Sequence, residues 1–166
     1  MNRTLYLIRH AKAEEGTVYQ RDHDRALLPE GVMAVARIGR YLHERGITAD
    51  RLVSSTACRA KDTAKVLAEQ LSLSPDEIIL DAALYDGGAR AYLAAVNTLP
   101  ADYTSVMLFG HNPDISYFTE FLTHQPVGDM DKGAVAAIRF DDMNWAEVSG
   151  RTGHLSFCIS PNDLTV

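Results

Sequence analysis

Two arginines and two histidines follow short apolar runs in this sequence, and their chemistry suits a negatively charged ligand. The four residues are Arg9, His10, Arg59 and His111. A guanidinium group stays charged and offers paired N–H donors that match phosphoryl oxygens. A neutral imidazole can act as a nucleophile, whereas a protonated imidazole donates hydrogen bonds. The four side chains therefore predict an anion pocket, and phosphate is the anion that they suit best.

The segments that must position these residues alternate between apolar runs and helical periodicity. We expect strands at 5–8, 51–54, 77–80, 105–109, 134–140 and 154–159, and helices from Pro29, after Ser55, at 89–99 and at 115–122. This alternation predicts an α/β three-layer sandwich, with a mostly parallel sheet, helices on both faces and an antiparallel C-terminal hairpin at one edge. Ligands of such sheets bind beyond the carboxyl ends of the strands, where the four basic residues would meet.

Length and composition narrow the class of protein. The 166 residues predict one domain, 1–166, with no insertion that could cap the site. A net charge of -6 argues against a nucleic-acid binder, and no apolar stretch reaches the length of a membrane span. Two cysteines and no signal-peptide core predict free thiols and a cytoplasmic protein. Nothing in the sequence requires a dimer, so we expect a monomer.

Other kinds of phosphate chemistry do not fit the residues. A cysteine-based phosphatase needs an arginine six positions after its cysteine, but Ala64 follows Cys58 and Leu164 follows Cys158 at that distance. The sequence has no Gly-x-x-x-x-Gly-Lys loop and no His-Glu-x-x-His motif. The remaining histidines lack metal-ligand spacing and are expected to be surface or structural: His23, His43, His124 and His154. A histidine nucleophile remains, and we expect neither a metal nor a cofactor, because the arginines supply positive charge.

Several motifs, taken in order, resemble the histidine phosphatase (phosphoglycerate mutase-like) superfamily. They are Arg9-His10-Ala11, the 24–27 segment with Gly31, Ser54-Ser55 followed by Arg59-Ala60, and Gly110-His111-Asn112-Pro113. Ala26 and Leu28 depart from the proline and threonine of the family pattern. Leu84-Tyr85, Trp145 and the 160–164 segment are similar to the SixA-type branch of phosphohistidine phosphatases.

The resemblance implies a role for each of the four basic residues. His10 would attack phosphorus as a neutral imidazole whose other nitrogen is held by a hydrogen bond, and water would then release inorganic phosphate. Arg9, Arg59 and a protonated His111 would stabilise the phosphoryl oxygens in the transition state.

Three further residues are candidates for substrate binding or for the general acid. Arg25 matches a position in the phosphate pocket of SixA-like proteins, and Asn112 is a second candidate for substrate binding, although fixing the turn is its simpler role. Asp86 stands where many family members place a general acid, but an aspartate before two glycines is also typical of a turn. Tyr85 is expected to pack.

Many family members use a glutamate as this general acid, and the sequence has none there. Its absence favours a phosphohistidine substrate over an alkyl phosphate, because a protonated imidazole leaves without a strong acid. The expected partner is a phosphotransfer protein in signal transduction. Two alternatives remain open: a small-molecule phosphomonoesterase or mutase of the same superfamily, and a non-catalytic module that binds phosphate.

Overall fold

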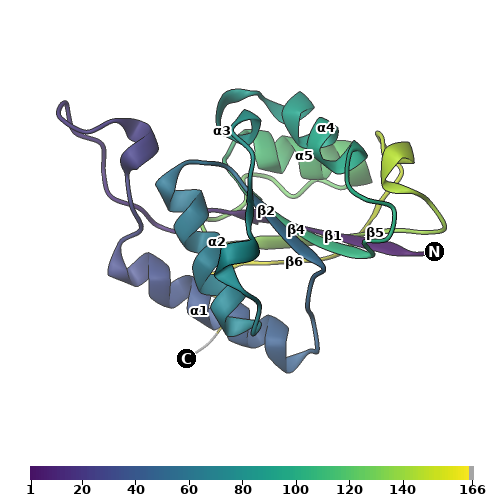
Figure 1. Ribbon diagram of the computed structural model, residues 1–166, viewed down its shortest axis with the longest axis horizontal. Helices are drawn as coiled ribbons and strands as arrows, with labels where there is room; N and C mark the ends of the chain where they lie inside the picture. Colours follow the sequence, from purple (N-terminus) through teal and green to yellow (C-terminus); the bar gives the residue numbers. More distant parts are fainter. Residues whose placement is uncertain (165–166) are drawn as a thin grey trace.

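A six-stranded sheet forms the centre of the protein in the computed structural model, which describes residues 1–164 (Figure 1). Its strands are β1 (Arg3–Arg9), β2 (Arg51–Ser54), β3 (Ile79–Leu80), β4 (Ser105–Gly110), β5 (Val135–Phe140) and β6 (His154–Ile159). They lie in the order β3-β2-β4-β1-β5-β6. The first four strands are parallel, whereas β5 and β6 form an antiparallel hairpin at one edge.

Helices cover both faces of this sheet (Figure 1). One face carries α1 (Pro29–Glu44) and α2 (Cys58–Gln70), and the other carries α3 (Ala83–Asp86), α4 (Ala89–Asn97) and α5 (Asp114–Thr123). The predicted α/β sandwich is therefore confirmed. Within residues 1–164, none of the helices is long and apolar enough to cross a bilayer.

The apolar run of β1 shows why the strand could be predicted. Leu5 and Leu7 pack with the helices of one face, whereas Tyr6 and Ile8 pack with those of the other. Successive side chains of a strand point to opposite faces, so a strand buried on both sides is apolar throughout.

The strand predicted at 77–80 is shorter than expected. Pro75–Glu77 forms a 3₁₀ turn, and only Ile79–Leu80 pairs with β2. Proline presets the backbone for a helical first turn, which explains why the chain enters this strand late.

The carboxyl ends of the three central strands lie level with one another. Arg9 pairs with Gly110, and Ser54 pairs with Phe109. The next residues continue the pairing, because the His10 amide donates to the Gly110 carbonyl over 3.0 Å. The sheet register thus places the residues that follow β1, β2 and β4 at one edge.

A close approach fixes the segment that follows His10. The Leu28 amide donates to the Lys12 carbonyl over 3.0 Å, just before α1 begins. Gly31, in the first turn of α1, packs against the same carbonyl, and a Cβ atom there would lie 2.2 Å from the Lys12 oxygen. Only glycine allows α1 to pack this closely against the strand end.

Candidate active site

The structure brings the four basic residues together at the carboxyl end of the sheet. His10, Arg59 and His111 are each 7% exposed, so all three are buried. The ring centroids of His10 and His111 are 5.3 Å apart. The positive charges of Arg9 and Arg59 act on both rings and lower the pKa of each histidine.

His10 has the protonation state of a nucleophile. Its Nδ1 lies 2.7 Å from the Ala11 carbonyl oxygen, and a carbonyl can only accept a hydrogen bond. Nδ1 therefore carries the hydrogen, which leaves the lone pair on Nε2. Burial lowers the pKa of His10 to about 4, and the charges of Arg59 and Arg9 add to this effect. The ring is thus neutral near pH 7.

Thr63 ties the His10 segment to Arg59. The Ala11 amide donates to the Thr63 hydroxyl over 3.0 Å, and this hydroxyl donates to the Arg59 carbonyl over 2.7 Å. Thr63 is fully buried in α2. The nucleophile candidate and the arginine of the second motif are therefore joined through one side chain.

His111 is held by its neighbours on both sides. Its amide donates to the Tyr92 hydroxyl over 2.9 Å, and its Nε2 lies 2.8 Å from the Ser55 hydroxyl. The Ser55 oxygen already accepts from the Ala57 amide, so its hydrogen can be donated to Nε2 of His111. The ring hydrogen then resides on Nδ1, which is buried and has no partner within the described chain.

His111 is neutral in the protein without a bound anion, whereas the expected protonated ring belongs to the phosphoryl-bound site and stays a prediction. Burial lowers its pKa to about 3, and the neighbouring His10 and Arg59 add to the decrease. A cationic ring beside an arginine and a second imidazole would be destabilised. A bound dianion would act in the opposite direction and favour the protonated ring.

Each of the two arginines has a buried Nε–H donor that no acceptor in residues 1–164 meets. Arg9 donates from Nη1 to the Met130 carbonyl over 2.8 Å. Arg59 donates from Nη1 to the Asp22 carbonyl and from Nη2 to the Asp22 carboxylate, over 2.9 and 3.0 Å. The Nε atoms of both arginines are buried without an acceptor among residues 1–164. A buried donor left unpaired costs about 1–3 kcal/mol, which an oxyanion could recover by accepting from it.

Asp22 was not expected at this site. Its carboxylate accepts from Arg59, from Arg25 over 2.8 Å and from the Tyr85 hydroxyl over 2.7 Å. The hydrogen bonds from Tyr85 and the arginines hold the pKa of Asp22 well below its ordinary value. Tyr85 therefore does more than pack, although its ring also meets His111 edge-on at 5.7 Å. The sequence offered one signal for this role: Asp22 stands three residues before Arg25, which is a spacing at which an acid and a base can pair.

The three remaining candidates, Arg25, Asn112 and Asp86, make their hydrogen bonds to other parts of the chain or lie exposed to solvent. Arg25 donates to the Glu14 carbonyl and to Asp22, so its link to Arg59 is indirect. Asn112 uses both ends of its amide to fix the turn, donating to the Met130 carbonyl and accepting from Ser116 over 2.6 Å. Asp86 is exposed at the end of α3, directly after Tyr85.

Gly110 allows His111 to follow β4 at this place. A Cβ atom on Gly110 would lie 2.1 Å from the Tyr92 hydroxyl oxygen. That hydroxyl accepts from the His111 amide and donates to the Leu84 carbonyl over 3.2 Å. The glycine of the third motif is thus required by the tyrosine that orients His111.

Comparisons with known proteins agree with this fold. Residues 5–91 match the family model of the histidine phosphatase superfamily (branch 1). Among solved structures, the SixA protein of Nakamurella multipartitia, provisionally assigned as a phosphohistidine phosphatase, is 29% identical with a TM-score of 0.80, over 97% of each chain. A protein histidine phosphatase SixA in complex with tungstate is 19% identical with a TM-score of 0.84, over 98% of this chain and 99% of that one. An uncharacterized protein of Picosynechococcus sp. strain PCC 7002 is 26% identical over 81% of this chain and 84% of its own length.

Proposed function

This chain belongs to the histidine phosphatase superfamily (branch 1) and is a phosphatase, and we propose that its substrate is a phosphohistidine on a phosphotransfer protein. The substrate class comes from the names of its SixA relatives and from the chemistry of the site. As a single domain without a cap, the chain would leave its site open to a side chain on a folded partner.

One observation carries the proposed chemistry: a neutral histidine is surrounded by residues with buried N–H donors that lack acceptors. The donors are Nε of Arg9, Nε of Arg59 and Nδ1 of His111. A transferring phosphoryl group has three equatorial oxygens, and its transition state is stabilised mainly by fixed donors and positive charge.

In the first step, His10 Nε2 attacks phosphorus while the P–N bond of the substrate breaks. The electron pair of that bond goes to the leaving imidazole, and a phosphohistidine forms on His10. Nδ1 of His10 stays bonded to the Ala11 carbonyl, which keeps the attacking nitrogen in place. A protonated phosphohistidine releases a neutral imidazole, so this step requires no strong acid from the protein.

In the second step, water attacks the phosphorus on His10. The P–N bond breaks, inorganic phosphate leaves and the lone pair returns to Nε2. Arg9 and Arg59 supply the positive charge throughout, so the proposed cycle uses no metal or cofactor. Asp86, directly after Tyr85, is the candidate general acid for protonating an alkoxide, and it keeps a phosphomonoesterase as the second candidate function.

The test compares phosphate release from three substrates: a phosphotransfer domain phosphorylated on histidine, a phosphohistidine peptide and p-nitrophenyl phosphate. We expect release from both phosphohistidine substrates, a weaker response to the ester and no effect of a chelator. His10→Ala should abolish release, whereas the exposed His154→Ala serves as the matched control. Equal activity of wild type and His10→Ala would overturn the mechanism, and preference for the ester would overturn the substrate class.

A further inference from the structure

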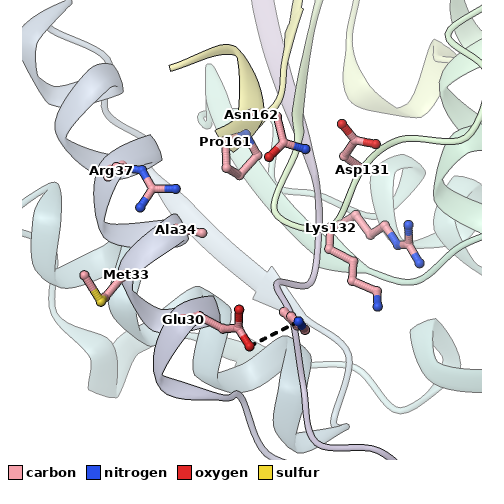
Figure 2. A pocket seen from close by; sticks show the side chains of 10 residues that line it. Glu30, Met33, Ala34, Arg37, Asp131, Lys132, Pro161 and Asn162 are labelled. Atoms are coloured by element: carbon pink, nitrogen blue, oxygen red, sulfur yellow. Dashed lines mark ion pairs between the residues drawn. The ribbon is translucent and has the colours of Figure 1, made fainter. Parts of the chain in front are cut away.

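A hollow lies beside the candidate site, between α1 and the segments that carry residues 131–132 and 161–162 (Figure 2). Its volume is about 580 Å³. Six charged residues line it: Arg9, Lys12, Glu30, Arg37, Asp131 and Lys132. We call this hollow the basic groove. In Figure 2, Arg37 points from α1 across the groove toward the turn of Pro161 and Asn162.

The C-terminal hairpin builds the far wall of the basic groove. After β6 ends, the Ser160 hydroxyl donates to the Asp131 carboxylate over 2.8 Å, and Pro161–Asp163 forms a 3₁₀ turn. Pro161 also packs near Gly133, whose φ of 81° lets the chain turn into β5. The two segments are therefore held together as one wall facing α1.

The charges of the groove do not cancel. Four of the six charged lining residues are basic and two are acidic. Glu30 is paired with Lys12 over 3.1 Å, and Asp131 accepts a hydrogen bond from Ser160. Arg37 and Lys132 form no ion pair within the part of the chain that the structure describes, and Nε of Arg37 is buried without an acceptor there. The groove is thus locally cationic on a chain whose net charge is -6, so its charge is not a consequence of the overall composition.

The groove is continuous with the candidate site. Arg9 lines the groove and also lies close to His10, and Lys132 is near enough to His10 to lower its pKa. A phosphohistidine placed at His10 would therefore have its neighbouring residues close to Lys132, at the end of a groove that Arg37 also lines.

We propose that the basic groove binds acidic side chains that flank the phosphohistidine of the protein substrate. This inference rests on the proposed function. The volume of the basic groove is that of a site for a small ligand or a short peptide segment and is larger than a single ion requires. Complementary charge across such a contact favours the correct partner and accelerates encounter. The groove would select among phosphohistidine proteins without taking part in phosphoryl transfer.

The experiment uses phosphohistidine peptides that differ only in their flanks, acidic in one and neutral in the other. We expect wild type to favour the acidic peptide by about tenfold in kcat/KM at low salt, the order of two charge contacts. Arg37→Glu and Lys132→Glu should each remove most of this preference. Thermal unfolding of every variant checks that it is folded. Arg37→Gln, which removes the charge without reversing it, gives a milder variant for the same comparison.

The matched controls are Arg40→Glu, one turn further along α1, and Lys65→Glu on α2. Both residues are exposed and neither lines the groove, so both variants should keep the preference for acidic flanks. An equal kcat/KM for the two peptides in wild type, or a preference that survives Arg37→Glu and Lys132→Glu, would overturn the proposal.

Failure of the proposed function has a different signature, because no phosphohistidine peptide would then be hydrolysed whatever its flanks. In that case, binding of the two peptides to His10→Ala by fluorescence anisotropy decides the question. Tighter binding of the acidic peptide, lost in the Arg37→Glu background, would support the groove. Equal dissociation constants would overturn it.

Discussion

His10 and His111 are positioned by the sheet, whereas Asp22 and Tyr85 reach the same site from segments near the surface. The first pair is buried and held by backbone hydrogen bonds at the ends of β1 and β4. The Asp22 side chain is 51% exposed and is held by ion pairs with Arg25 and Arg59. The reacting groups are thus placed by the core, and the charge around them is adjusted by a loop. Substitutions of the sheet-positioned residues and of the loop residues should therefore differ in the size and in the kind of their effects.

Arg59 joins the two halves, so its substitution should have the largest effect. Arg59→Lys keeps the charge but loses the planar donors that hold Asp22 and supply the buried Nε. We expect kcat on phosphohistidine to fall by about 10²–10³, the usual range for removing one oxyanion donor. Steady-state kinetics measure this fall in kcat, with Arg40→Lys as the control variant. A fall of less than threefold would refute a direct role of Arg59.

The buried histidines should make stability depend on pH. The folded pKa of His111 is about 3 and that of His10 about 4, below the usual 6.5. As the pH falls below about 6.5, the unfolded chain takes up protons that the folded chain does not. The free energy of unfolding should then fall by about 1.4 kcal/mol per pH unit for each histidine, until the folded ring titrates.

Urea unfolding between pH 7 and 4.5 tests this dependence. His111→Gln removes one of the two buried histidines, so the free energy of unfolding of this variant should fall less steeply with decreasing pH than that of wild type. The difference between the two proteins should therefore narrow as the pH decreases. Parallel curves would show that His111 is not held neutral by the fold.

Gly110→Ala should damage the half of the site that the sheet positions. The added Cβ would meet the Tyr92 hydroxyl at 2.1 Å, and overpacking of this kind costs about 1–3 kcal/mol. Activity should fall as well, because the tyrosine orients His111. Gly16→Ala is the control, since its nearest contact is an ordinary 3.7 Å. A fully stable and active Gly110→Ala protein would contradict the packing described above.

Of the four substitutions considered, Asp22→Asn should have the smallest effect. The amide keeps a similar shape but loses the charge that holds Arg25 and Arg59, so we expect kcat to fall by about tenfold or less. Stability should change by only about 1 kcal/mol or less, as for other half-exposed ion pairs. Asp24→Asn in the same 3₁₀ turn is the comparison. A loss as large as that of Arg59→Lys would mean that Asp22 itself takes part in the reaction.

The same contrast explains what the sequence could predict. The strands that carry His10 and His111 are apolar runs, and parallel strands end at one edge, so grouping the motifs required only local patterns. The link from Asp22 to Arg59 and Tyr85 spans 37 and 63 residues and follows no periodicity. Neither the role of Ser55 beside His111 nor the neutral state of that ring could be read from the sequence, because both depend on burial.

The close contact of Gly31 with the Lys12 carbonyl has a thermodynamic consequence. Together with the Leu28 hydrogen bond, it immobilises the chain that follows His10 before any substrate arrives. Oxyanion binding should then lose little conformational entropy of the protein, since the attacking imidazole is already ordered. The Ala11 amide, which is buried and bonded to the Thr63 hydroxyl, should exchange its hydrogen with solvent only when the whole molecule unfolds.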